Sequence, residues 1–519
     1  MPEDRPSIVL FMVDQLSAKW LEGDCRKVCP TPNLDRLRER GVAFSQCIVS
    51  NPMCMPARAT LATGLTTRGH GVLQNGYELD PAIPTFMGLL HKQRWRTGAF
   101  GKLHFIPHFR TVYPDYKPYG FDFVSNTEDP RAGEWLDWIE DKHPTLYHSA
   151  LATVWATELP DLKRYGRAKQ DLSAQIREIR AKYQWPTDRW PGGTAGYHTL
   201  PLPEDASQTA WITARAVEFL DKFAPHMPIF AQISYVQPHS PFCPPEPCME
   251  RIDPRPIPAP IPPEWVSEGQ PPDCFAESEG ALRKIPDTWR TYRHYYFADV
   301  AHLDDQLGKV VAALERMGRR DTTYLLFLSD HGELLMDHGF TGKGERHYDA
   351  CIRVPLVIAG PGLKAGSTVD AFVQLEDICP TILEMAGVPY PEPVVMGPYH
   401  QGAKPKALPG RSLLTLCRGR VPSDWRNAAY VESFNNLRGS DPMDWARSIR
   451  TTEWRYTTYP GGKGEQLFRL RDDPNETKNL AFDPRFAHAR TLLRDRLLEQ
   501  VVLQDYPHGP RSRFALGVH

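Results

Sequence analysis

Short apolar runs alternate along the chain with segments in which apolar residues recur every three or four positions. The runs are apolar throughout, which is typical of parallel strands buried on both faces. They predict strands over residues 7–13, 42–49, 97–100, 228–236, 323–328 and 354–359. The periodic segments predict helices over residues 31–40, 84–93, 210–223, 300–317 and 376–386. This alternation predicts an α/β fold with a large, mostly parallel sheet and helices on both faces.

The pattern changes after about residue 390, where Pro and Gly become frequent and the apolar runs become short. Strands are predicted over residues 429–433, 445–451, 455–458 and 466–469, and a helix is predicted over 484–503. These elements predict a smaller α+β subdomain. We therefore expect a large catalytic domain over residues 1–390, the subdomain over 391–503 and an extended tail over 504–519.

Two segments of the large domain do not fit its alternating pattern. An insertion at about 125–205 includes residues 160–183, which are rich in Lys, Arg, Glu and Gln at helical spacing and so indicate a solvated surface. A loop at 241–272 is rich in Pro, which is excluded from the interiors of regular helices and sheets. Long loops of this kind often face substrates, so we expect both segments to border a binding site.

The composition of the 519-residue chain is that of an ordinary soluble protein. Its 61 Lys and Arg nearly balance its 63 Asp and Glu, so we expect neither a nucleic-acid nor a membrane partner. The first residues are polar and lead directly into the first strand, without the features of a secretory signal. The ten cysteines are scattered. We therefore expect a cytoplasmic protein with reduced cysteines.

Polar residues directly follow four of the predicted strands. They are Asp14 and Gln15 after 7–13, Lys102 and His104 after 97–100, His239 after 228–236, and Asp330 and His331 after 323–328. Ligands of open parallel sheets bind at the carboxyl ends of the strands. A single histidine at such a place is more often structural, but packing hardly explains seven polar residues at four strand exits. The sequence therefore predicts a functional site at this edge.

Residues 51–64 predict a helix that begins near a cysteine. Pro56 suits a first helical turn, and Gly64 can end the helix, so Cys54 should lie at its N-terminus. The unpaired amides of that terminus favour an oxyanion. The spacing Cys54-x-Pro56-x-Arg58 can arise by chance in a chain of this composition, and a buried structural cysteine is the alternative. The motif therefore supports a functional role for Cys54 only in combination with the polar residues that follow the predicted strands.

The Cys54-x-Pro56-x-Arg58 motif resembles the signature of the type I sulfatases, members of the alkaline phosphatase superfamily. Other matches are Asp14-Gln15 and Asp330-His331 at metal-binding positions, Lys102 and His104 in a Gly-Lys-x-His segment, Lys343 at a sulfate-binding position, and the C-terminal runs 449–456 and 473–480. The resemblance implies an alkaline-phosphatase-like fold. It also implies that a formylglycine-generating or equivalent maturation enzyme oxidises Cys54 to formylglycine.

The resemblance also implies a role for each residue. Cys54, as formylglycine, would be the nucleophile and would bind one divalent cation together with Asp14, Gln15, Asp330 and His331. Carboxylate, amide and imidazole ligands suit Ca²⁺ or Mn²⁺. The remaining assignments are Arg58 for orienting the nucleophile, Lys102 and Lys343 for neutralising the transferred group, His239 for protonating the leaving oxygen, His104 for the base that ends the cycle, and Asn75 for donating to an ester oxygen.

Two residues depart from the common sulfatase pattern. Many sulfatases have a second aspartate in place of Gln15 and an asparagine in place of His331, and both departures resemble phosphonate monoester hydrolases and choline sulfatases. The pair Lys102 and His104 instead resembles the sulfatase pattern, which the phosphonate hydrolases lack. We therefore expect hydrolysis of aryl or small alkyl sulfate monoesters. The alternatives are a phosphonate monoester or phosphodiester hydrolase using the same site, with promiscuity between the two reactions, and an inactive binding protein, which would be expected to have lost one of these residues.

The final residues give a prediction about assembly. Pro507 and Pro510 exclude a helix, yet Tyr506, Phe514 and Leu516 are apolar residues that would be unfavourable in water. A frayed tail is one interpretation, and a tail that packs across a symmetric interface is the other. Because similar enzymes on the phosphonate hydrolase and choline sulfatase side of the family are oligomers, we expect a homodimer or homotetramer.

Overall fold

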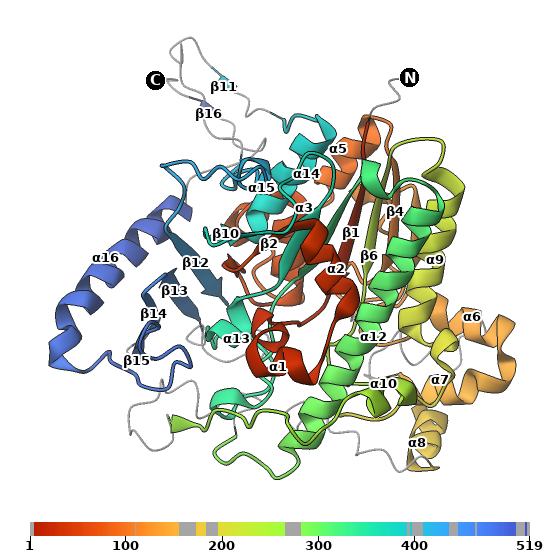
Figure 1. Ribbon diagram of the computed structural model, residues 1–519, viewed down its shortest axis with the longest axis horizontal. Helices are drawn as coiled ribbons and strands as arrows, with labels where there is room; N and C mark the ends of the chain where they lie inside the picture. The colour runs from red at the N-terminus through yellow and green to blue at the C-terminus, as the bar shows by residue number, and fades with distance from the viewer. Residues whose placement is uncertain are drawn as a thin grey trace.

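The computed structural model describes residues 5–108, 110–154, 173–182, 196–264, 282–391, 395–396, 408–434, 445–461, 464–504 and 514–515. It contains a large sheet of eight strands flanked by helices and a separate antiparallel sheet of four strands near the C-terminus (Figure 1). The predicted fold class, a large and mostly parallel sheet with a smaller α+β part, is confirmed.

The large sheet has the strand order β5-β4-β6-β1-β7-β8-β2-β9. Its strands are β1 (Ser7–Val13), β2 (Gly41–Phe44), β4 (Arg96–Gly101), β5 (Phe123–Asn126), β6 (Ile229–Ser234), β7 (Thr323–Ser329), β8 (Leu356–Ala359) and β9 (Ser367–Val369). Central β1 runs parallel to β6 and β7, and all its residues are buried. Only β8 runs antiparallel to its neighbours among the described strands of this sheet.

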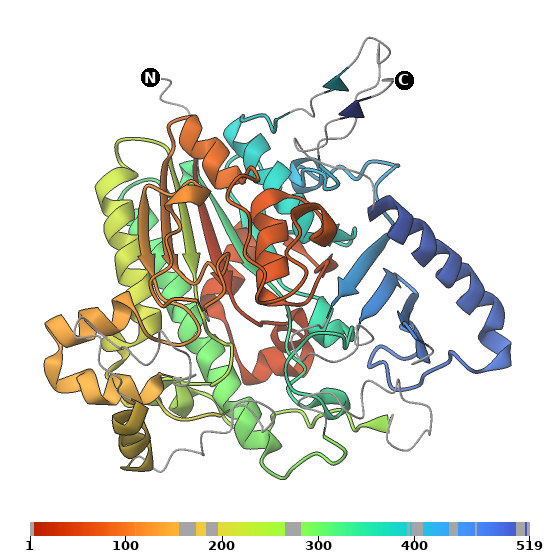
Figure 2. The ribbon, with the colours of Figure 1, turned by 180° about the vertical axis from the view of Figure 1, so that it is seen from behind.

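Helices cover both faces of this sheet, as Figures 1 and 2 show from opposite sides. One face carries α2 (Pro32–Arg40), α9 (Gln208–Phe223) and α12 (Trp289–Arg316). The other carries α3 (Cys54–Thr63), α5 (Phe86–Lys92) and α14 (Ile378–Ala386). In α9 the side chains of Ile212, Ala216 and Leu220 are buried on one stripe, so the helical period predicted from the sequence is the period of the buried face.

Three predictions about individual elements were wrong. The strand predicted over 42–49 is divided at Ser45 and Gln46 into β2 and a two-residue strand, β3 (Cys47–Ile48), which pairs with β10 (Val373–Gln374). Helix α12 begins at Trp289, well before the predicted start at 300. The proline-rich loop contains a short helix, α10 (Glu246–Arg251), whose Pro247 lies in the first turn, where a missing amide hydrogen costs nothing.

The insertion contains α6 (Glu134–Lys142), α7 (Tyr147–Thr153) and α8 (Ser173–Lys182), and its residues 155–172 and 183–195 lie outside the described residues. The small sheet contains β12 (Ala428–Ser433), β13 (Ala446–Thr451), β14 (Trp454–Tyr459) and β15 (Gly464–Arg469). Helix α16 (Ala487–Gln504) packs against β13 and β14 and buries Leu493 and Leu497.

The predicted tail 504–519 lies outside the described residues except for Gln504 and β16 (Phe514–Ala515). No helix in the described part of the chain is both long and apolar enough to span a membrane.

Candidate active site

The carboxyl ends of β1, β4, β6 and β7 lie side by side and bring the predicted polar residues together. In the parallel register Met12 of β1 lies opposite Ser234 of β6 and Leu328 of β7. Beyond the strands, the backbone amide of Asp14 donates to the carbonyl of Gln237 at 3.2 Å. The residues that follow these strands therefore meet at one edge, as the sequence predicted.

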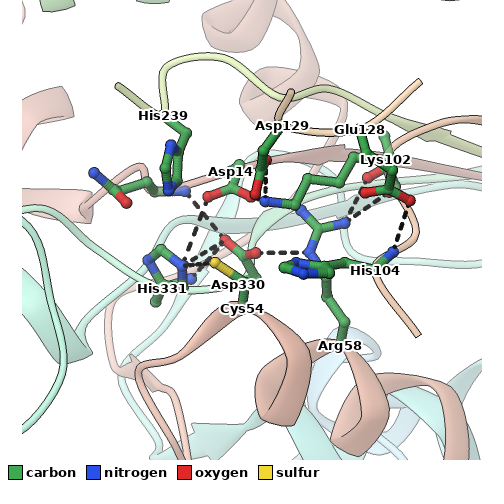
Figure 3. Close-up of polar contacts among 12 residues, drawn as sticks. Asp14, Cys54, Arg58, Lys102, His104, Glu128, Asp129, His239, Asp330 and His331 are labelled. Atoms are coloured by element: carbon green, nitrogen blue, oxygen red, sulfur yellow. Dashed lines mark hydrogen bonds and ion pairs between the residues drawn. The ribbon is translucent and has the colours of Figure 1, made fainter. Parts of the chain in front are cut away.

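Cys54 is the first residue of α3, and Gly64 ends that helix in the left-handed conformation, as predicted. The thiol of Cys54 is buried; its Sγ lies 3.2 Å from Nε2 of His331 (Figure 3). One amide of the first helical turn already has a side-chain partner, because Met55 N–H donates to Oδ1 of Asn75 at 3.0 Å. Asn75 thus lies at the helix N-terminus and keeps its NH₂ group for another partner.

Arg58 lies one turn after Cys54 and holds two carboxylates in place. Its Nε donates to Oδ2 of Asp330 at 2.8 Å, and Nη2 donates to Oδ2 of Asp14 at 3.1 Å. Its Nη1 donates to the carbonyl of Lys102 and to Oγ of Ser234. Burial opposes the charge, but Asp330 and Asp14 raise the pKa of Arg58 above its usual value. Arg58 is therefore a permanent cation between the two acids.

The oxygens that Arg58 does not use face the imidazole of His331. Its Nε2 lies 3.6 Å from Oδ1 of Asp14 and 3.7 Å from Oδ1 of Asp330. Four buried residues, Asp14, Asp330, His331 and Cys54, each offer one ligand atom, and these four atoms lie within 4.8 Å of one another (Figure 3). We call the space they enclose the cation position.

The chemistry of these atoms fits a divalent cation. Oδ1 of Asp14 is buried and has no hydrogen-bond partner among the described residues, which is costly unless a cation completes its coordination. Burial lowers the pKa of His331 to about 4, despite the opposing effect of Asp330, so its imidazole is neutral at pH 7 and can act as a ligand. Two carboxylates balance the charge of the ion.

Gln15 and Lys343 lie beside Cys54. Gln15 leaves β1 with a φ of +66°, an uncommon conformation for a residue other than glycine that turns the chain sharply at the strand end. Nζ of Lys343 donates to Oε1 of Gln15 at 2.8 Å and lies 2.8 Å from Sγ of Cys54. Burial lowers the pKa of Lys343, but Cys54 and Asp14 raise it more, so Lys343 is a cation.

Lys102 is buried between two acids. Its Nζ lies 2.5 Å from Oδ2 of Asp14 and 2.5 Å from Oδ1 of Asp129 (Figure 3). Burial lowers the pKa of Lys102, whereas Asp129 and Asp14 raise it above its usual value. Lys102 therefore contributes a fixed positive charge behind the cation position.

His104 has a φ of +53°, and its Nε2 lies 3.0 Å from Nδ1 of His108. Burial and the charge of Lys102 lower the pKa of His104 well below its usual value. Nδ1 of His108 lies 3.7 Å from Oδ2 of Asp129. Sequence reasoning missed His108 and Asp129. Asp129 comes shortly after β5, so the rule that polar residues follow strands would have found it if that strand had been predicted.

His239 follows β6 in a segment with cis peptide bonds before Pro238 and Pro241. Its Nδ1 lies 2.6 Å from the carbonyl oxygen of Ser240. A carbonyl can only accept, so Nδ1 carries a hydrogen, and Nε2 is the nitrogen available to a substrate. Figure 3 shows this imidazole on the same side of the cluster as Asp14 and His331. The structure thus brings together every residue that the sequence singled out for the site.

Family models and known proteins match this chain over nearly its whole length. The family model described as Sulfatase matches residues 6–388, and the model described as N-sulphoglucosamine sulphohydrolase, C-terminal, matches residues 337–502. An arylsulfatase of Clostridium perfringens is 26% identical over 511 residues, which cover 96% of this chain and 94% of that protein. The multifunctional alkaline phosphatase superfamily protein PehA of Trinickia caryophylli is 28% identical over 534 residues, covering 95% and 93%.

A solved structure shows the same architecture. The phosphonate monoester hydrolase of Agrobacterium radiobacter superposes with a TM-score of 0.74 at 25% identity, covering 96% of each chain. The similarity therefore includes the small C-terminal sheet as well as the large one.

Proposed function

The chain belongs to the sulfatase family, and we propose that it hydrolyses aryl or small alkyl sulfate monoesters with formylglycine at position 54. The position of Cys54 carries this proposal. It begins α3 beside the cation position, and its Sγ lies 2.8 Å from Nζ of Lys343 and 3.2 Å from Nε2 of His331. A structural cysteine would not need a cation, a neutral imidazole and a helix N-terminus around one buried atom.

Asp14, Gln15, Asp330 and His331, with residue 54, would hold the divalent cation, for which we propose Ca²⁺ or Mn²⁺. When bound, the cation polarises the oxygens of the ester and of the nucleophile. Oxygen ligands suit either ion, and Mn²⁺ accepts an imidazole readily. Arg58 fixes the two carboxylates through their Oδ2 atoms and leaves both Oδ1 atoms beside Nε2 of His331.

Formylglycine supplies, as its hydrate, one hydroxyl for attack on sulfur and a second whose deprotonation releases the sulfate. Conversion of Cys54 requires a formylglycine-generating or equivalent maturation enzyme. Lys343 lies in contact with the side chain at position 54 and neutralises charge on the transferred group. Lys102 adds positive charge from its place between Asp14 and Asp129.

Two histidines provide proton transfer. His239 protonates the leaving oxygen from Nε2 as an imidazolium, and Nδ1 keeps its own hydrogen on the carbonyl of Ser240. His104 is the base that releases the sulfate. Its imidazole is neutral, and its buried Nδ1 has no hydrogen-bond partner in the described part of the chain, so that nitrogen remains for a reacting group. Asn75 can donate to an ester oxygen through its NH₂ group, since Met55 uses only its Oδ1.

Hydrolysis of phosphonate monoesters or phosphodiesters at the same site is the second candidate function. Gln15 and His331, the two departures from the common sulfatase pattern, both lie at the cation position or beside Cys54. The similarity to the Agrobacterium radiobacter hydrolase supports the same alternative. Lys102 and His104 favour the sulfate reaction.

One kinetic panel tests the proposal. It compares kcat/KM for aryl sulfates, choline sulfate, sugar sulfates, phosphonate monoesters and phosphodiesters at one cation concentration. We expect the highest value for an aryl or small alkyl sulfate and complete loss in Cys54→Ala. Cys417→Ala, which removes a buried thiol in the short helix α15 (Leu414–Cys417), is the matched control and should keep activity. A higher kcat/KM for a phosphonate ester would establish the second candidate instead.

A further inference from the structure

Glu333 lies two residues after His331 and is fully buried, although nothing in the proposed reaction uses it. Its carboxylate accepts three hydrogen bonds. Oε2 accepts from Nε2 of Gln15, and Oε1 accepts from the backbone amides of Leu335 at 2.9 Å and Gly342 at 2.7 Å. These contacts tie the end of β1 to the loop that carries Lys343.

A primary amide has a donor end and an acceptor end, and its surroundings decide which way each points. Oε2 of Glu333 accepts from Nε2 of Gln15, so the NH₂ end of Gln15 faces Glu333. Oε1 of Gln15 therefore points the other way and accepts from Nζ of Lys343, which contacts Cys54. The bond from Gly342 fixes the residue directly before Lys343. Glu333 thus contacts both sides of the Gln15–Lys343 hydrogen bond: the amide of Gln15 itself and the backbone of the residue before Lys343.

We propose that Glu333 is a positioning residue: it orients the amide of Gln15 so that the oxygen faces the nucleophile and the bound cation. Where many sulfatases have an aspartate, this chain needs an amide, because a carboxylate at position 15 would face the buried carboxylate of Glu333 without a hydrogen to donate. This inference rests on the proposed function only in taking Gln15 as a ligand of the cation.

Three variants test the inference through cation affinity, measured with Mn²⁺ by calorimetry on otherwise intact protein at about pH 8. In Glu333→Gln the new amide can offer its NH₂ to position 15, so Gln15 turns over and presents its own NH₂ to the cation. In Gln15→Glu, which keeps the side-chain shape, two buried carboxylates face each other. Each variant should bind Mn²⁺ about 10–100-fold more weakly, the usual effect of losing a residue that orients a ligand.

The double variant Gln15→Glu with Glu333→Gln should recover most of the lost affinity. Its new amide donates to one oxygen of the new carboxylate, and the other oxygen faces the cation. A role of Glu333 in folding alone would not produce this recovery. Glu345→Gln is the control, because it removes a buried carboxylate from the same loop without a contact to Gln15, and it should leave Mn²⁺ affinity unchanged.

Unchanged affinity in Glu333→Gln, or a double variant no better than Gln15→Glu, would overturn the inference. If Glu333→Gln does not fold, the Mn²⁺ affinity of Gln15→Glu tests the inference by itself. An added negative ligand would ordinarily strengthen cation binding, so unchanged or tighter binding by that variant would overturn the inference. A wild-type protein that binds Mn²⁺ but hydrolyses no ester in the kinetic panel would refute the proposed function and leave this affinity test intact.

Discussion

Replacing Lys102 by methionine should destabilise the protein strongly at neutral pH, because the ammonium group balances buried negative charge. Its Nζ lies 2.5 Å from both Asp14 and Asp129, and all three side chains are buried. Methionine has a similar volume, so the change removes mainly the charge. Asp14 keeps Arg58 as a partner. The groups that remain near Asp129 are histidines, His239, His104 and His108. His108 lies 3.7 Å away, and burial lowers its pKa to about 4, so it is neutral at pH 7.

Removing one partner of a buried ion pair typically costs about 3–5 kcal/mol, because the other charge remains buried. The entropy of unfolding is about 2.1 cal/mol/K per residue, so over the 519-residue chain this cost lowers Tm by about 3–5 °C. Lys309→Met is the matched control. Its ammonium pairs with Glu204 at 3.1 Å but is half-exposed, and such pairs contribute about 0–1 kcal/mol.

The effect should depend on pH with a definite sign. In the wild-type protein burial raises the pKa of Asp129, but Lys102 lowers it further, below the ordinary value of 3.8. The pair therefore stabilises the fold above that value and loses its effect as the pH falls through the lower folded pKa. Without Lys102, burial raises the pKa of Asp129 above 3.8, so the cost is full at neutral pH and disappears as the carboxyl is protonated.

Scanning calorimetry at about pH 7.5 and about pH 5 measures this difference directly. We expect the Tm of Lys102→Met to be several degrees below that of the wild-type protein at the higher pH, and the difference in Tm to be clearly smaller at the lower pH. A loss no larger than that of Lys309→Met, or the same loss at both pH values, would refute the electrostatic explanation.

Three further predictions follow from the site and the tail. Asp330→Asn keeps the side-chain shape but removes a charged ligand, so metal analysis should show loss of the cation together with activity; a metal-loaded, active variant would contradict the ligand assignment. His239→Ala should lower kcat/KM severely for esters with poor alkoxide leaving groups and only mildly for nitrophenyl esters, because only the former need a proton on the leaving oxygen. An equal loss of kcat/KM across a leaving-group series would assign His239 to substrate binding. Deleting residues 504–519 should weaken a homodimer or homotetramer in sedimentation; a monomeric full-length chain would contradict this.

The sequence predicted the centre of the fold better than its edges. Strands β1, β6 and β7 are buried on both faces, so their apolar runs are continuous and easy to recognise. The edge strands β5 and β9 have only four and three residues and include polar or exposed positions such as Phe123 and Ser367, so no comparable run marks them. The division of β2 from β3 was missed because apolar residues continue on both sides of Ser45 and Gln46.

The site could be predicted as far as it depends on strand exits. Parallel register carries Asp14, Lys102, His239 and Asp330 to one edge whatever the loops do. Contacts between loops could not be predicted in this way. The bond between Gln15 and Glu333 joins residues 318 positions apart, and no local pattern specifies it. The same holds for the partners of Lys102 and His104.

The mass of the peptide that contains Cys54, taken from protein of known specific activity, shows whether residue 54 is formylglycine in the active enzyme. We expect that sulfur is lost and oxygen gained at residue 54, in a fraction that rises with specific activity. Fully active protein in which this peptide carries only the unmodified thiol would contradict this expectation.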